Sequence, residues 1–123
     1  MNEYAILQLK ENEDLKYELF ASLEELRCMD MKLNINHYKV VYTAPLPPYR
    51  KINELLEDIY MEFNIRQPKD FKGHSLSVSD IIVIKEDDKI DCYYVDSIGF
   101  QKLSGFMNLE DYQSYQRITE KTP

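Results

Sequence analysis

Four consecutive β-branched apolar residues, from Ile81 to Ile84, form the most distinctive stretch of this sequence. The run is too short for a buried helix and has polar turn formers on both sides, so it predicts a strand that is buried on both faces. Residues 85–89 are polar and have the length of a hairpin loop, and the β-rich run 90–95 follows them. We therefore expect a central strand with a hairpin partner, against which the rest of the chain packs.

Apolar periodicity elsewhere predicts three further strands and two helices. In the first helix apolar residues recur at helical spacing from Leu15 to Leu26, and Asp14 precedes them as an N-cap. In the second helix they recur from Ile52 to Phe63, which is the clearest helical period in the sequence. We expect strands at residues 4–10, 38–43 and 99–103, and helices at residues 15–29 and 50–64.

The order of these elements favours a single α+β domain. Hairpin-linked strands that follow isolated helices are typical of this class, and 123 residues suffice to bury a core without metals or disulfides. We predict a small, mostly antiparallel sheet with two helices packed on one face. The domain is expected to span residues 1–108, and residues 109–123 form a short C-terminal tail.

Composition and charge narrow the class of protein. The 22 acidic and 15 basic residues give a net charge of -7, which disfavours direct binding to nucleic-acid phosphates. No apolar run reaches the roughly 18 residues of a membrane span, and the N-terminus lacks the basic-then-apolar order of a signal peptide. These features predict a cytoplasmic protein without a cofactor.

Residues with metal-binding chemistry are present but lack the spacing of a site. Cys28 and Cys92 form no C-x-x-C pair, and we expect both to be reduced residues in or near the core. Together with His37 and His74 they make no ligand pattern typical of zinc. Phosphate-loop, dinucleotide-binding and zinc-protease motifs do not occur in the sequence either. No metal site is predicted.

His74, Ser75 and Asp80 contain the residue types of a hydrolase triad. Adjacent residues on an extended chain point to opposite faces, so His74 and Ser75 are not expected to converge. We interpret the serines and Asp80 as groups that bond neighbouring backbone at the entry to the central strand. Asp96 is interpreted as a turn residue ahead of Gly99, which is expected to have a positive φ. The prediction is a non-enzyme, and a catalyst using His74 or Asp96 is the third hypothesis.

Acidic residues cluster in the second helix and at the hairpin tip. Glu54, Asp58 and Glu62 are four residues apart, so three carboxylates lie along one helical face, and each like-charged pair costs roughly 0.2–0.5 kcal/mol. Two interpretations stay open: solvated charges that keep a small protein in solution, or a surface that docks on a basic protein. The candidate partner-binding acids are Glu54, Glu57, Asp58, Glu62, Glu86, Asp87 and Asp88.

Tyrosine is abundant, with ten in the chain. Tyr49, Tyr112 and Tyr115 are not accounted for by strand or helix packing, and amphipathic aromatic residues are common interface anchors. They are the weaker candidates for partner contacts. Equally, Tyr112 and Tyr115 would pin the tail to the core together with Phe106.

Several stretches of the sequence together resemble one known family. The most specific are the run from Ser75 to Asp80 and the run from Val95 to Phe100. In order and spacing the stretches resemble the YodL-like domain found in proteins of conjugative transposons and related mobile elements of Gram-positive bacteria. The resemblance covers residues 4–106, implies a mobile-element origin and carries over no catalytic residue. The other matching stretches are residues 41–43, 56–60, 63–65, 68, 70–71 and 73–84.

The resemblance, the single-domain size, the negative charge and the lack of a catalytic constellation lead to a functional prediction. We expect a protein-binding module that inhibits a host defence protein stoichiometrically, in the manner of anti-CRISPR or anti-restriction proteins. Its carboxylates would occupy the positive groove that otherwise holds DNA or guide RNA, so the expected partner is a basic nucleic-acid-binding protein. The alternative is a regulatory or scaffolding module of conjugative transfer that binds a relaxase or another element-encoded protein.

Overall fold

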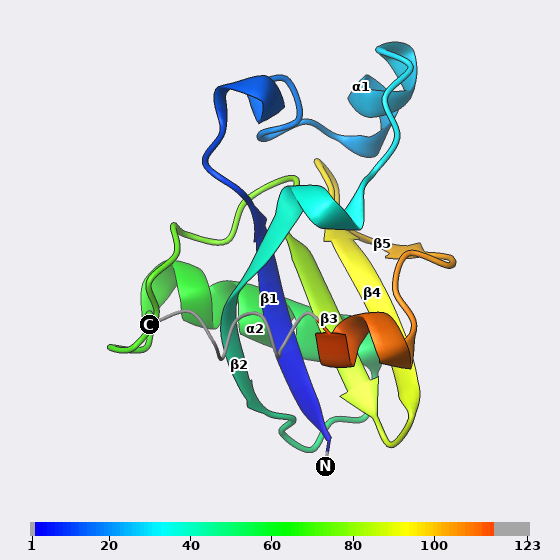
Figure 1. Ribbon diagram of the computed structural model, residues 1–123. Helices are drawn as coiled ribbons and strands as arrows, with labels where there is room; N and C mark the ends of the chain where they lie inside the picture. The colour runs from blue at the N-terminus through cyan, green and yellow to red at the C-terminus, as the bar shows by residue number, and fades with distance from the viewer. Residues whose placement is uncertain (1, 115–123) are drawn as a thin grey trace.

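Five antiparallel strands form one sheet in the order β2-β1-β3-β4-β5 in the computed structural model, which describes residues 2–114 (Figure 1). Helices cover this sheet on both faces, and two short 3-10 turns lie near one end of it, where β1 ends and β2 begins. The strands are β1 (Glu3–Leu9), β2 (Tyr38–Pro45), β3 (Ile81–Glu86), β4 (Lys89–Val95) and β5 (Phe100–Leu103). The helices are α1 (Leu23–Cys28) and α2 (Ile52–Ile65), and the 3-10 turns are η1 (Glu13–Leu15) and η2 (Ile35–His37).

The β-branched run forms the middle of the sheet, as its composition predicts. Strand β3 pairs with β1 on one side and with its hairpin partner β4 on the other, and Ile82 lies opposite both Ile6 and Tyr93. The side chains from Ile81 to Ile84 are between 0% and 1% exposed. All five expected strands are present and pair antiparallel, so the predicted α+β class is confirmed.

The arrangement of the helices differs from the expectation that both pack on one face. Apolar residues of α2, including Leu56 and Phe63, pack with Ile82 on one face of the sheet. Leu26 of α1 and Tyr112 belong to the core on the opposite face. Residues 109–114, which hold Tyr112, are helical and cross that face in front of the sheet, whereas α2 lies behind it (Figure 1). The reason is that the side chains of β3 alternate between two apolar faces, and each face needs a cover.

The first predicted helix, over residues 15–29, is wrong. The chain instead makes η1, several turns and then the short helix α1. Asn12 rather than Asp14 caps η1, since the Asn12 side chain accepts a hydrogen bond from the Asp14 N–H at 3.0 Å. Phe20 interrupts the helical pattern because its φ of 64° lies outside the α-helical region.

Helix α1 begins with a capping box that the apolar pattern alone does not reveal. The Ser22 side chain accepts a hydrogen bond from the Glu25 N–H, and the Glu25 carboxylate accepts one from the Ser22 N–H. These two bonds satisfy backbone donors that the first turn of a helix leaves free. The Ser-x-x-Glu spacing was therefore a better start signal than Asp14.

Several smaller expectations are also decided by the structure. Gly99 has a φ of +69°, as predicted for the turn after Asp96. Cys92 is buried, whereas Cys28 is exposed rather than in or near the core. Among residues 2–114, no helix is long and apolar enough to cross a membrane.

Candidate functional site

A groove of about 520 Å³ separates α2 from the proline-rich connection that follows β2. Glu54, Asp58 and Glu62 line its helical side, because residues four apart share one face of a helix. All three side chains are exposed, while α2 buries its opposite side against the sheet. The other wall contains Pro45, Pro47 and Pro48, which lack backbone donors and make the connection stiff. We call this hollow the acidic groove.

The carboxylates of the acidic groove are not neutralised within the part of the chain that the structure describes. No ion pair in that part involves any of the three, although Arg50 also lines the groove. The charge of one of them, Glu62, acts on Tyr4, which also lines the groove. Burial raises the pKa of Tyr4 well above its usual range, and the charge of Glu62 raises it further. The Tyr4 hydroxyl therefore stays a neutral hydrogen-bond donor.

Tyr49 lies at the edge of the acidic groove and is already engaged. Its hydroxyl donates a hydrogen bond to a carboxylate oxygen of Glu86. This bond, together with partial burial and the charge of Glu86, raises the pKa of Tyr49 to about 12. Tyr49 thus joins the groove to the end of β3, and Glu86 is a structural acceptor as well as a surface charge.

The remaining candidate acids lie outside the acidic groove. Glu57, one residue before Asp58, faces a different hollow beside Tyr60 and Phe100. Asp87 and Asp88 are exposed in the turn between β3 and β4. Asp87 has a φ of 55°, and its backbone N–H donates to the Asn2 side chain at 2.8 Å. The structure therefore brings together three of the seven predicted acids.

Of the other two tyrosine candidates, only Tyr112 lies within the described residues, and it is buried. Tyr112 is 2% exposed, and its hydroxyl donates a 2.6 Å hydrogen bond to Glu3. The alternative that Tyr112 pins the tail to the core is therefore the correct one, and the interpretation of Tyr112 as a partner anchor is wrong. Tyr115 lies outside the described residues.

A buried polar cluster occupies the end of the sheet next to the loop that follows α2. Asp80 is completely buried, and one carboxylate oxygen accepts hydrogen bonds from the Ser77 N–H at 2.8 Å and from the Gln8 amide at 3.1 Å. The other oxygen has no hydrogen-bond partner and lies 3.9 Å from His74 Nε2. The His74 ring donates from Nδ1 to the Ser75 carbonyl oxygen at 2.7 Å, so Nε2 is the nitrogen that faces Asp80.

This cluster contains two members of the nominal triad but not its geometry. The Ser75 hydroxyl accepts a bond from Gln67 at 3.1 Å, whereas His74 reaches only the Ser75 carbonyl. His74 and Ser75 therefore do not place a nucleophile beside a base. The expected bonding to neighbouring backbone is confirmed for Ser77 and Asp80. The Ser75 hydroxyl instead bonds the Gln67 side chain, and the Ser79 hydroxyl accepts a bond from the distant Phe20 N–H. No group of three metal-binding side chains is found among residues 2–114.

Gln8 is the member of the cluster that the sequence analysis missed. Its side chain accepts a bond from the His74 N–H at 3.1 Å and donates one to the His74 carbonyl oxygen at 2.8 Å, besides its bond to Asp80. A Cβ at Gly73 would lie 2.3 Å from the Gln8 Oε1, so only glycine permits this close approach. The available signal was a lone amide in an otherwise apolar strand, which needs partners when buried.

Comparison with known proteins agrees with the resemblance described above. A family model of the YodL-like domain matches residues 3–106 of the 123-residue chain. No curated protein and no solved structure gives a significant match. The matched range contains all five strands, α1, α2 and the acidic groove. The chain belongs to the YodL-like domain family.

Proposed function

We propose that this chain is a non-catalytic, protein-binding module of a mobile genetic element, and that it inhibits a host defence protein by occupying a positively charged nucleic-acid-binding surface. The concrete form is an anti-CRISPR-like inhibitor that acts stoichiometrically in the cytoplasm. One observation supports this most: Glu54, Asp58 and Glu62 line a groove without an ion partner among residues 2–114.

The energetics of α2 argue that these charges serve a purpose besides stability. Glu54 with Asp58, and Asp58 with Glu62, are like-charged pairs at i,i+4, and each pair destabilises the helix by roughly 0.2–0.5 kcal/mol. A lysine at the middle position would turn both repulsions into attractions. The cost is recovered on binding, because a basic partner neutralises all three carboxylates and is steered towards them.

The opposite wall of the acidic groove favours a defined partner geometry. Prolines restrict the backbone of residues 45–48, so this wall loses little conformational freedom when a partner binds. Tyr4 and Tyr49 add rigid amphipathic surface at the base and edge. A cationic side chain from a partner would thus enter a pre-formed hollow with carboxylates on one side and apolar rings below.

The test uses two neighbouring positions on the same helix. Asp58→Lys and Glu57→Lys change the charge equally, but only Asp58 lines the acidic groove. Tagged wild type, each single variant and the triple variant E54K/D58K/E62K are used to capture proteins from a bacterial lysate that expresses CRISPR and restriction systems. The captured proteins are eluted in salt steps. Partners held by exposed charge contacts should be released as the salt concentration rises, because such contacts are screened at higher ionic strength.

The expected result is a nucleic-acid-binding effector that wild type and the Glu57 variant capture equally. Asp58→Lys should weaken its binding, and the triple variant should weaken it on the order of tenfold or more, while circular dichroism shows an unchanged fold. Equal losses for Glu57→Lys and Asp58→Lys would show that only net charge matters and would remove the groove from the proposal. Capture of conjugative-transfer proteins alone would favour the transfer-module alternative.

A further inference from the structure

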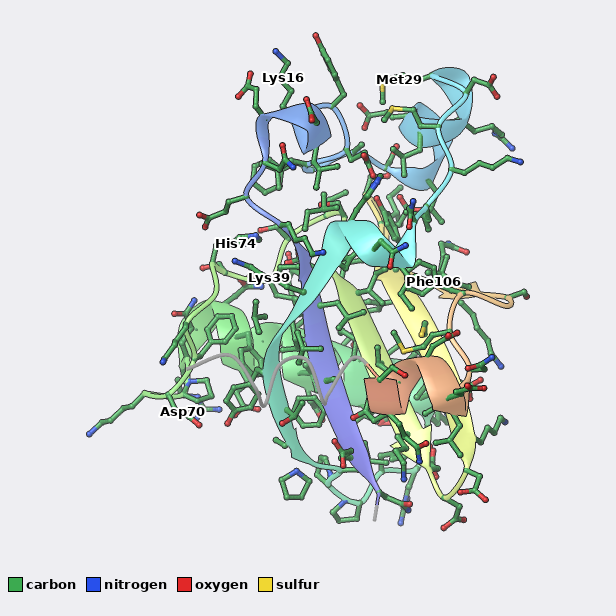
Figure 2. All side chains as sticks on the ribbon, viewed as in Figure 1. Lys16, Met29, Lys39, Asp70, His74 and Phe106 are labelled. Atoms are coloured by element: carbon green, nitrogen blue, oxygen red, sulfur yellow. The ribbon has the colours of Figure 1, made fainter. Side chains whose placement is uncertain are left out.

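A second hollow of about 520 Å³ lies at the end of the sheet opposite to the β3–β4 hairpin. It is formed where β1 and β2 meet η1, the turns after it, and the loop that precedes β3. Gln8 and His74 of the buried cluster lie along it. Figure 2 shows Lys39 and His74 at this end of the sheet and Lys16 on the segment beyond it. None of the seven acids considered above lines this hollow.

The hollow is basic although the protein is acidic. Four lysines and two glutamates line it, which leaves a local excess of two positive charges in a chain of net charge -7. Lys16 forms an ion pair with Glu13 at 3.1 Å. The other three lysines make no ion pair within residues 2–114, so their charge is available to a ligand. The four lysines are Lys10, Lys16, Lys39 and Lys72.

One wall of the hollow is apolar and is held in a strained conformation. Phe20 is 56% exposed, and its φ of 64° is unusual for a bulky residue. Its N–H donates to the Ser79 hydroxyl at 3.0 Å, and Ser79 itself has a φ of 87°. The Phe20 ring meets the His74 ring edge-on, with 6.1 Å between centroids. Leu19, beside it, is 40% exposed. The fold thus maintains an exposed aromatic wall despite the backbone strain that it requires.

The base of the hollow is rigid because the Gln8 side chain holds the loop at His74. Two hydrogen bonds join the Gln8 side chain to the main chain of His74, at 2.8 and 3.1 Å, and Gly73 allows the close approach. The volume of this pre-formed hollow falls within the range of small-molecule sites. Lysine ammonium groups bind phosphate as point charges, and aromatic side chains stack on nucleobases.

We infer that this hollow, which we call the lysine pocket, binds a mononucleotide, with phosphates against Lys10, Lys39 and Lys72 and the base against Phe20. The inference uses none of the acidic-groove residues. It can therefore fail while the proposed function stands, and the reverse also holds. The ligand is expected to be small, because the net charge of -7 repels long polyanions from the rest of the surface.

The test is a titration of the full chain with the four common nucleoside diphosphates. Binding is measured by isothermal titration calorimetry and by changes in the amide NMR shifts. The comparison ligands are the matching nucleosides, inorganic pyrophosphate and a short single-stranded oligonucleotide. We expect at least one diphosphate to bind and to shift the amides of Gly73, His74 and Lys39. Its nucleoside and pyrophosphate should each bind at least tenfold more weakly, because each lacks one of the two groups that the pocket recognises.

Matched variants assign the binding to the lysine pocket. Lys39→Glu with Lys72→Glu should weaken diphosphate binding at least tenfold. Lys32→Glu with Lys69→Glu makes the same charge change at exposed lysines outside the pocket. This double variant should bind the diphosphate within twofold of the wild-type affinity. Phe20→Gly removes the ring and accepts the positive φ, so the variant should stay folded, bind the diphosphate several-fold more weakly and leave pyrophosphate binding unchanged.

Four outcomes would overturn the inference. These are no binding of any of the four diphosphates at millimolar concentration, pyrophosphate binding as tightly as the diphosphates, equal losses in the two double variants, and binding of the oligonucleotide alone. The last outcome would identify a single-strand-binding surface instead of a nucleotide pocket.

Discussion

At the scale of single residues, Asp80 has an environment that is uncommon for a carboxylate. It is completely buried, and one of its carboxylate oxygens accepts no hydrogen bond. Burial raises the pKa of Asp80 to about 7, against the lowering effects of the Ser77 N–H, the nearby His74 and the Gln8 amide. Its charge in turn contributes to the raised pKa of Tyr38. Asp80 therefore titrates near neutral pH, unlike ordinary surface carboxylates.

This environment predicts a pH-dependent stability that Asp80→Asn removes. The pKa of Asp80 is higher in the folded than in the unfolded chain, so the folded state binds more protons between about pH 4 and 7. The stabilisation is complete below about pH 4 and is lost as the pH rises to about 7. We expect wild type to lose on the order of 1–4 kcal/mol more unfolding free energy than the variant across this window, measured by urea denaturation.

The side-chain amide introduced by Asp80→Asn keeps the shape of the carboxyl and can point its NH₂ towards His74 Nε2, so the variant is expected to fold. Other side-chain pairs, such as Glu18 with His37 at 3.0 Å, are present in both proteins, so their contributions cancel in the difference. Parallel stability curves from pH 4 to 7 would contradict a raised pKa for Asp80.

At the scale of elements, α2 has one side that is buried in the core and one side that lines the acidic groove. Its inner side, with Leu56 and Phe63, is part of the core, whereas its groove side carries like-charged residues spaced by four. Periodicity revealed both sides from the sequence, because helical spacing alone determines which residues share a face. The proline-rich connection forms the wall opposite the acidic side. Helical periodicity does not predict where this connection lies.

A charge reversal in the middle of this row should stabilise the protein. Asp58→Lys replaces two repulsive i,i+4 pairs with two attractive ones, so we expect an increase in unfolding free energy of about 1 kcal/mol at low salt. Glu57→Lys has a single acidic neighbour on its own face, Glu54 at i,i+3, and should gain about half as much. Thermal and urea denaturation of the two variants measure the difference.

The gain should shrink at high salt, because the pairs are exposed. A destabilised Asp58→Lys would mean that the carboxylate makes a favourable contact in the folded chain, which would weaken the case for a surface reserved for a partner. If the variant is more stable and also binds the partner less tightly, stability and binding oppose each other at this position.

The segment from Leu15 to Leu26 is not the continuous helix that its apolar spacing predicts. Apolar spacing from Leu15 to Leu26 fits a helix, yet the chain makes a 3-10 turn, an irregular stretch and the short helix α1. The break occurs at Phe20, whose N–H bonds Ser79, 59 positions away in the sequence. A contact of that range leaves no trace in the local sequence. The start of α1, in contrast, has a local polar signal, the Ser-x-x-Glu spacing of its capping box.

At the scale of the whole molecule, β3 is the strand that the rest of the fold protects. It has paired neighbours on both sides and covered residues on both faces, whereas β2 and β5 are the edges of the sheet. Backbone amides in such a strand exchange only when the sheet opens broadly.

We therefore expect the amides of β3 that bond to β1 and β4 to exchange most slowly with solvent, and those of β5 to exchange by local fraying. Hydrogen exchange followed by NMR gives the protection of each amide. Equal protection of β3 and β5 would contradict this hierarchy.

A cavity in β3 should weaken the whole fold. Ile82→Ala should lower the unfolding free energy by about 2–5 kcal/mol, because it empties volume between Ile6, Tyr93 and α2. Urea denaturation measures the loss. A change below about 1 kcal/mol would mean that neighbouring side chains collapse into the space, and that this part of the core is loosely packed.

The sequence by itself determined the elements whose signal is local. The β-branched run predicted β3, the polar break and the β-rich run after it predicted the hairpin with β4, and the helical period predicted α2 together with its acidic side. Each of these signals is carried by residues close together in the chain, where backbone geometry alone sets which side chains share a face.

The tertiary structure alone decided the order of the strands and which distant residues lie in contact. Strand β1 lies beside β3, with Glu3 opposite Lys85, although β2 and both helices separate the two strands in the sequence. That order places Gln8 against His74 and Asp80, sets α2 against the prolines, and gathers distant lysines into one pocket. Such contacts depend on strand order, which follows from burying both faces of β3 at once and not from any local pattern.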